Sequence, residues 1–284
     1  MNNKSNNKDK IIPILTQASS EQLGIAVEEN LNELFRAMMI LPDSEIVERD
    51  DVKIHHAFPS NPMFKGAWAT RLTNENADAV IDETLAWYKQ RGAPFIFWWM
   101  TPRSTPADLR ERLMARGFQE NIAGDPGMAT ELSALNKNIK TPEGFRIERA
   151  MNESQIRDWA NVFVESFEIP AWAGNAWYDA TTRVGAENAP WKLYVGYLND
   201  KPVATNILFK GAGVASVYGV GTIPSVRGQG IGAAITLEPL LDARAEGYKY
   251  GVLFSTELGH PVYRRLGFED VNYKMARYLW MNGG

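Results

Sequence analysis

The chain has 284 residues, of which 45% are hydrophobic and 23% are charged, a composition typical of a globular protein with a packed core. Its 30 basic and 34 acidic residues are mixed along the chain and give a net charge of −4, so no basic surface for nucleic acid or an acidic membrane is expected. The absence of cysteine excludes disulfides, thiolate metal sites and a cysteine nucleophile, and three histidines (His55, His56 and His260) are too few for a histidine-rich metal site, so we expect no bound metal.

The N-terminus and one polar stretch divide the chain. Residues 1–10 are polar and without an apolar core, and we expect them to form a disordered tail. The apolar run that follows is too short for a signal sequence or a membrane span, which predicts a cytoplasmic protein. A polar segment with proline and glycine then lies between two parts of the chain in which predicted strands and helices follow one another in a similar order. We therefore predict a first domain over 11–135, a linker over 136–142 and a second domain over 143–284.

In the first domain, predicted strands alternate with predicted helices. The apolar spacing favours two amphipathic helices, and the β-branched and aromatic runs favour strands. In chain order these are a strand over 64–72, a helix over 77–92, a strand over 93–100, a helix over 107–117 and a strand over 128–135.

The second domain begins with a strand and two helices and continues with three strands. Ile156, Trp159 and Phe163 recur at helical spacing in the first of these helices. Short turns join the three strands, which predicts an antiparallel meander. In chain order we predict a strand over 145–150, helices over 152–167 and 174–188, strands over 191–198, 202–210 and 213–223, a helix over 231–246, a strand over 248–256, a short helix over 260–267 and a strand over 271–280.

The two domains resemble copies of one another. The sequence ARGFQE at 115–120 matches RLGFED at 265–270, and the elements around the two segments follow the same order. The first copy has NENADAVIDE where the second has a glycine-rich loop, and Leu113 where the second has Tyr263. We therefore predict that the first copy is degenerate.

The glycine-rich loop VRGQGIGAAIT, residues 226 to 236, leads directly into a predicted helix. The first amides of a helix have no partner within the helix and carry the positive end of its dipole, so glycines that expose them suit a phosphate group. A tight turn without a ligand is the alternative. A dinucleotide site would fit Gly228, Gly230 and Ala233, but that motif requires a strand of a parallel β-α-β unit running straight into the first glycine. Gly219 and Gly221 precede the loop, where isolated strand glycines often mark a bulge.

The passage from Val217 to Phe268 resembles the GNAT family of acyl-CoA-dependent N-acyltransferases. The resemblance rests on four features, which are Arg227-x-x-Gly230-x-Gly232 in the loop, VGTIP before it, Tyr263-x-x-x-Gly-Phe after it, and the order of the elements. The resemblance covers residues 143–284, and the first domain only through its degenerate repeat. It implies an α/β (α+β) fold in two tandem copies, with a mixed, mostly antiparallel central sheet flanked by helices.

The resemblance also implies a site for acetyl-CoA as co-substrate. Backbone amides of the loop would bind the pyrophosphate, and the strand before it would pair with the pantetheine. The implied cofactor-binding residues are Val220, Gly221, Thr222, Arg227, Gly228, Gln229, Gly230, Ile231, Gly232 and Ala233. Tyr263 would be the general acid that protonates the leaving thiolate.

The general base departs from the family pattern, because the strand before the loop has no glutamate. Glu257, Glu165, Glu168 or a water molecule are the candidates. We expect an N-acetyltransferase that moves the acetyl group to a primary amine by direct attack in a ternary complex. A non-catalytic acyl-CoA-binding or sensing protein is the alternative, and an NAD(P)-dependent oxidoreductase is a third reading. We expect a small-molecule amine rather than a protein as acceptor, no nucleic-acid or membrane partner, and a monomer or homodimer.

Overall fold

The computed structural model describes residues 13–41, 44–57 and 64–283, and the predicted tail over 1–10 lies outside them. The strands and helices predicted for the first part of the chain are confirmed, although the last strand begins at Gln119 rather than Met128. One helix and two strands precede them. The elements are α1 (Ser20–Ala37), η1 (Met38–Ile40), β1 (Glu45–Glu48), β2 (Lys53–His56), β3 (Lys65–Trp68), α2 (Ala77–Gln90), β4 (Phe95–Met100), α3 (Leu109–Met114) and β5 (Gln119–Glu131).

The second part of the chain also has the predicted order of elements. Its three central strands form the expected antiparallel meander, because β-branched and aromatic runs are separated by short turns. The elements are β6 (Phe145–Arg149), α4 (Glu153–Phe167), α5 (Ala171–Val184), β7 (Trp191–Leu198), β8 (Lys201–Gly211), β9 (Val214–Thr222), η2 (Pro224–Val226), α6 (Ile231–Ala245), β10 (Tyr250–Phe254), α7 (His260–Leu266) and β11 (Glu269–Met281).

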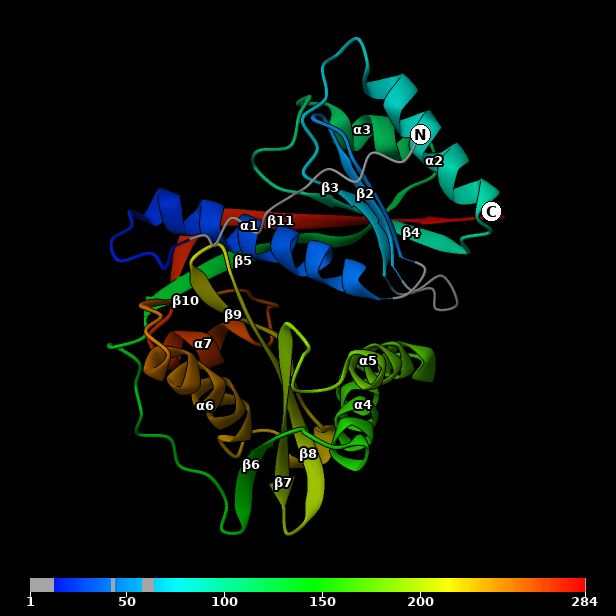
Figure 1. Ribbon diagram of the computed structural model, residues 1–284. Coiled ribbons are helices and arrows are strands. Elements are labelled where there is room, and N and C mark those ends of the chain that lie inside the picture. Colours follow the sequence, from blue (N-terminus) through cyan, green and yellow to red (C-terminus); the bar gives the residue numbers. More distant parts are fainter. Residues whose placement is uncertain (1–12, 42–43, 58–63, 284) are drawn as a thin grey trace.

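In the described part of the chain, eleven strands form one sheet in the order β1-β2-β3-β4-β11-β5-β10-β9-β8-β7-β6. Only β3–β4 and β9–β10 pair in parallel among these neighbours, so the predicted mixed, mostly antiparallel sheet flanked by helices is confirmed. The two halves have exchanged their last strands. β11 lies between β4 and β5, and β5 lies between β11 and β10, as the red and green strands of Figure 1 show.

The exchange extends to the hydrophobic core. Tyr278 and Trp280 of β11 are buried with the residues of α2, α3 and β4 from the first half. Met128 of β5 and Leu132, which follows it, are buried with α6 and α7 from the second half. Each half therefore contributes a strand to the other half's part of the sheet and side chains to the other half's core.

Helices cover both faces of the sheet in the second half. Ile231, Ile235 and Leu240 of α6 pack in one cluster with β8 and β9, while Trp159 and Phe163 of α4 pack in another with α1 and α5. Figure 1 shows α6 and α4 on opposite sides of β7 and β8. Among the helices of the described ranges, none is long and apolar enough to cross a membrane.

Candidate active site

A gap opens in the sheet where β9 separates from β10. The two strands pair only at Ala215 with Gly251 and Ser216 with Val252, although β9 continues to Thr222. On the other side of β9, the register against β8 shifts by one residue, which is a β-bulge. Gly219 lies in that bulge with φ of +54°, a conformation that glycine adopts without strain. The bulge therefore accompanies the separation of the two parallel strands.

The loop after β9 presents free backbone amides at the start of α6. Gly228 and Gly230 have φ of +79° and +82°, and Gly230 is the N-cap residue of the helix. Among the described residues, the amides of residues 228 to 233 have no hydrogen bond to a side chain or to a carbonyl outside the helix. A row of unpaired amides at the positive end of a helix dipole is a binding site for an anion such as a phosphate.

The side chain of Arg227 connects this loop to the end of α4. Its Nε donates to the carbonyl oxygen of Thr222 at 3.0 Å, and its Nη2 donates to the carbonyl oxygen of Ser166 at 2.8 Å. Gly221 makes this approach possible, because a Cβ there would lie 2.7 Å from the Cβ of Ser166. Arg227 therefore holds β9, the loop and α4 together, and leaves further N–H groups for an anion.

Tyr263 lies on α7 with its ring packed and its hydroxyl unpaired. The side chain is 8% exposed, and its ring meets that of Phe268 edge to face at 6.0 Å between centroids. Burial raises the pKa of the Tyr263 phenol, so the hydroxyl keeps its proton at neutral pH. No hydrogen-bond partner for this hydroxyl is present in the described ranges. An unpaired, protonated phenol is suited to donate to a developing anion.

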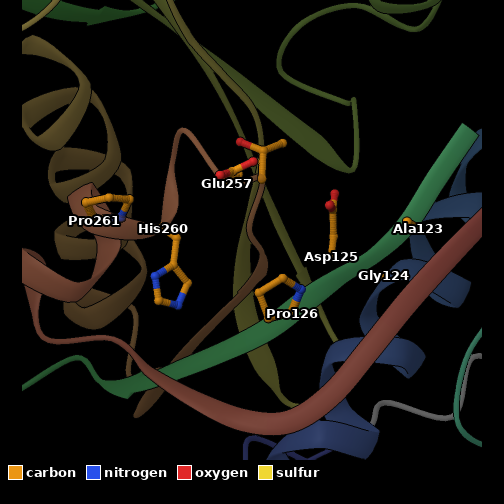
Figure 2. A pocket seen from close by; sticks show the side chains of 8 residues that line it. Ala123, Gly124, Asp125, Pro126, Glu257, His260 and Pro261 are labelled. Carbon is orange, nitrogen blue, oxygen red and sulfur yellow. The ribbon is translucent and has the colours of Figure 1, made fainter.

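A cavity of about 580 Å³ lies between β5 and the connection from β10 to α7 (Figure 2). One wall comes from the first half and the other from the second, so the strand exchange creates the cavity. Its lining residues are Ala123, Gly124, Asp125, Pro126, Thr256, Glu257, His260 and Pro261. In the parts of the chain that are described, no group of three or more His, Asp or Glu side chains could hold a metal ion.

No protein-family model matches this chain. A segment of 99 residues, 34% of this chain, is 35% identical to a mycothiol acetyltransferase of Saccharomonospora viridis and spans about a third (32%) of that relative's length. A GCN5-related N-acetyltransferase from Kribbella flavida superposes with a TM-score of 0.70 and 18% identity over 92% of this chain and 97% of that one. A tandem GNAT protein from the clavulanic acid biosynthesis pathway superposes with a TM-score of 0.57 and 12% identity over 93% and 95%. The chain has the GNAT fold.

In the first half of this tandem GNAT fold, hydrogen bonds close the position that corresponds to the gap between β9 and β10. β3 and β4 also pair over only two residue pairs. Beyond them, however, the amide of Leu72 donates to the carbonyl of Thr105 at 3.2 Å, and the amide of Thr105 donates to the carbonyl of Thr70 at 3.3 Å. These hydrogen bonds join the segments that follow β3 and β4, which correspond to the segments that separate in the second half.

The entrance to α2 also differs from the entrance to α6. Thr73 and Asn76 exchange hydrogen bonds between side chain and backbone where the second half has its glycines. Leu113 stands at the position of Tyr263 and is fully buried. The first half of this GNAT fold thus has a hydrogen-bonded turn in place of the glycines and a leucine in place of the phenol.

The candidate bases lie in different places. Glu257 lines the cavity, whereas Glu165 and Glu168 are exposed near the end of α4 and are not among the lining residues. The cavity contains a further carboxylate, Asp125, which no motif in the sequence indicated. Asp125-Pro126-Gly127 has the composition of a turn, yet these residues belong to β5. No local signal in the sequence relates them to the second half.

Proposed function

We propose that this protein is an N-acetyltransferase that moves the acetyl group of acetyl-CoA to a primary amine. The observation that carries the proposal is the gap between β9 and β10 next to the unpaired amides of residues 228 to 233. The GNAT fold and the partial identity to an acetyltransferase support the same activity. Among the described residues, the glycine-rich loop and Tyr263 belong to the second half, and we infer that only this half is active.

The cofactor would lie along β9 and end at α6. Its pyrophosphate would accept hydrogen bonds from the loop amides between Gly228 and Ala233, beside the positive charge of Arg227. Among the described strands, none pairs with β9 beyond Ser216 on the β10 side, so Val220 and Thr222 can pair with an extended amide-bearing chain such as pantetheine. The thioester would then lie in the gap.

Direct attack by the amine is the chemistry that these residues support. The nitrogen bonds to the acetyl carbon as the carbon–sulfur bond breaks, and the departing thiolate receives a proton from Tyr263. Because burial raises the pKa of this phenol, the proton is present at the pH of the reaction. The chain has no cysteine, so no acyl-cysteine intermediate can form.

A thiol-release assay tests the proposal. The protein is mixed with acetyl-CoA and a panel of primary amines, and free thiol is measured with a colorimetric reagent. Because the chain has no cysteine, every thiol that appears comes from coenzyme A. Release that depends on the amine supports the acetyltransferase. Coenzyme A binding without release for any amine would instead favour an acyl-CoA-binding protein, and selective binding of NAD would favour an oxidoreductase.

A further inference from the structure

Asp125 is a half-buried carboxylate in the cavity of Figure 2, and it comes from the first half of the chain. In the described ranges it accepts no hydrogen bond. Within the described ranges, the opposite charge that lowers its pKa is Arg277 on β11, whose guanidinium lies 4.5 Å from the ring centroid of Phe97 and donates to Asn121. Asp125 therefore has no structural partner that would explain its burial.

The strand exchange brings Asp125 to the edge of the gap. Gly127 of β5 pairs with Phe254, the last residue of β10, and the amide of Ser255 donates to the carbonyl of Pro126 at 2.9 Å. Asp125 is the next residue along β5, beyond the end of β10. On the β10 side of β5, no strand among the described residues lies beside Asp125, because β10 ends at Phe254 and β9 has already separated from it.

Asp125 also lies on the face of the sheet opposite α6. In the antiparallel pair of β5 and β11 it is directly opposite Met275, and side chains of opposed residues project to the same face. Met275 is buried in the core cluster of α1, α4 and α5, whereas α6 packs in the cluster on the other face. A cofactor held at α6 and a ligand held at Asp125 would therefore approach the gap from opposite faces.

We propose that Asp125 binds the ammonium group of the acceptor amine and accepts the proton that this group loses before attack. The transfer step rests on the proposed function, whereas amine binding does not. The ammonium gives one proton to Asp125, which releases it to solvent. The nitrogen then bonds to the acetyl carbon, the thiolate takes the proton of Tyr263, and the phenolate recovers the second proton of the amine.

The surroundings of Asp125 suit this role. Burial raises the pKa of its carboxyl and Arg277 opposes the increase, so it is a stronger proton acceptor than an exposed aspartate. The charged or titratable groups around it are Arg277 and Lys274 on β11, Glu257 on the connection from β10 to α7, and His260, the first residue of α7. Two carboxylates, Asp125 and Glu257, thus line one small cavity. We infer a small amine of net positive charge, rather than an amino acid, as the acceptor.

The test compares Asp125→Asn with the parent in two assays. Calorimetry measures the affinity of the protein, saturated with coenzyme A, for benzylamine, putrescine and lysine, and thiol release measures turnover from pH 5 to 9. We expect Asp125→Asn to bind coenzyme A as the parent does, to lose at least tenfold in affinity for putrescine, and to lose roughly 10²-fold or more in kcat/KM. The parent's turnover should fall at acidic pH as Asp125 is protonated, whereas the variant's turnover should decrease throughout the range below pH 9, because without Asp125 only the unprotonated amine can attack.

Asp200→Asn is the matched control, because Asp200 is in the turn between β7 and β8 and its side chain is 90% exposed. If Asp125→Asn does not fold, Asp125→Ser replaces it in the same comparison. If the parent releases no thiol but binds putrescine through Asp125, acetyl transfer is refuted and the amine site stands. The proposal is overturned if the parent binds none of the amines, or if Asp125→Asn matches the parent in affinity and turnover.

Discussion

Arg227 donates a 2.8 Å hydrogen bond from Nη2 to the carbonyl oxygen of Ser166, across 61 residues of chain. The same side chain donates from Nε to the carbonyl oxygen of Thr222. A single guanidinium thus fixes the end of β9 and the end of α4 in front of the amides at the start of α6. Arg227 therefore stabilises the loop and also lies beside the proposed pyrophosphate site.

Replacing Arg227 should therefore weaken coenzyme A binding. Charged hydrogen bonds contribute about 1.5–3 kcal/mol each, so Arg227→Ala should reduce the affinity at least tenfold in calorimetry. Arg227→Lys should recover only part of the loss, because a lysine cannot reproduce the two divergent donors of a guanidinium. Equal affinity of Arg227→Ala and the parent would show that neither the charge nor the hydrogen bonds contribute.

Gly232 offers a sharper test of the anion site than Gly230. A Cβ on Gly230 would collide with the carbonyl oxygen of Lys140, and its φ of +82° adds strain, so any substitution there disturbs the loop. A Cβ on Gly232 meets only Thr222 Oγ1, at 3.5 Å. Gly232→Ala should keep most of the coenzyme A affinity, whereas Gly232→Glu should lose it through repulsion of the pyrophosphate. If Gly232→Glu binds as well as Gly232→Ala, the pyrophosphate lies elsewhere.

Tyr263→Phe should separate chemistry from binding. Because no partner for the hydroxyl is present in the described residues, its removal leaves no buried group unpaired. We expect unchanged affinity for coenzyme A and a decrease of roughly 10²-fold in kcat, measured by thiol release. Tyr278→Phe, which removes a remote hydroxyl bonded to Glu120 at 3.2 Å, is the control. A Tyr263→Phe enzyme as fast as the parent would leave the tyrosine with a packing role alone.

The exchanged strands predict that the second half is not stable alone. A fragment of residues 143–284 would leave β10 without β5 on one side and would deprive β11 of both of its neighbours. Unpaired strand edges and exposed core residues favour aggregation. We expect this fragment to aggregate or to unfold without cooperativity in circular dichroism, and co-expression of residues 1–142 to restore a soluble pair. A monomeric fragment with the melting temperature of the full chain would contradict the exchange.

Local patterns in the sequence were sufficient for most of the secondary structure and for the loop. The helical spacing of Ile156, Trp159 and Phe163 predicted α4, because residues three and four apart share one face. The glycines at 228 and 230 indicated a loop with special backbone geometry, and both have positive φ. These signals depend on residues close together in the chain, so they are readable without the fold.

The place of Asp125 was decided by the tertiary structure alone. Its neighbours Pro126 and Gly127 resemble a turn, and only the pairing of β5 with β10 and β11 makes this segment a strand. That pairing joins residues at least 119 positions apart, and it depends on which of two similar strands pairs with each half. Neighbouring residues in the chain carry no information about this choice, because it follows from the burial of side chains in a shared core. The sequence alone thus determined the elements and the loop, whereas the tertiary structure determined which carboxylate lies at the edge of the gap between β9 and β10.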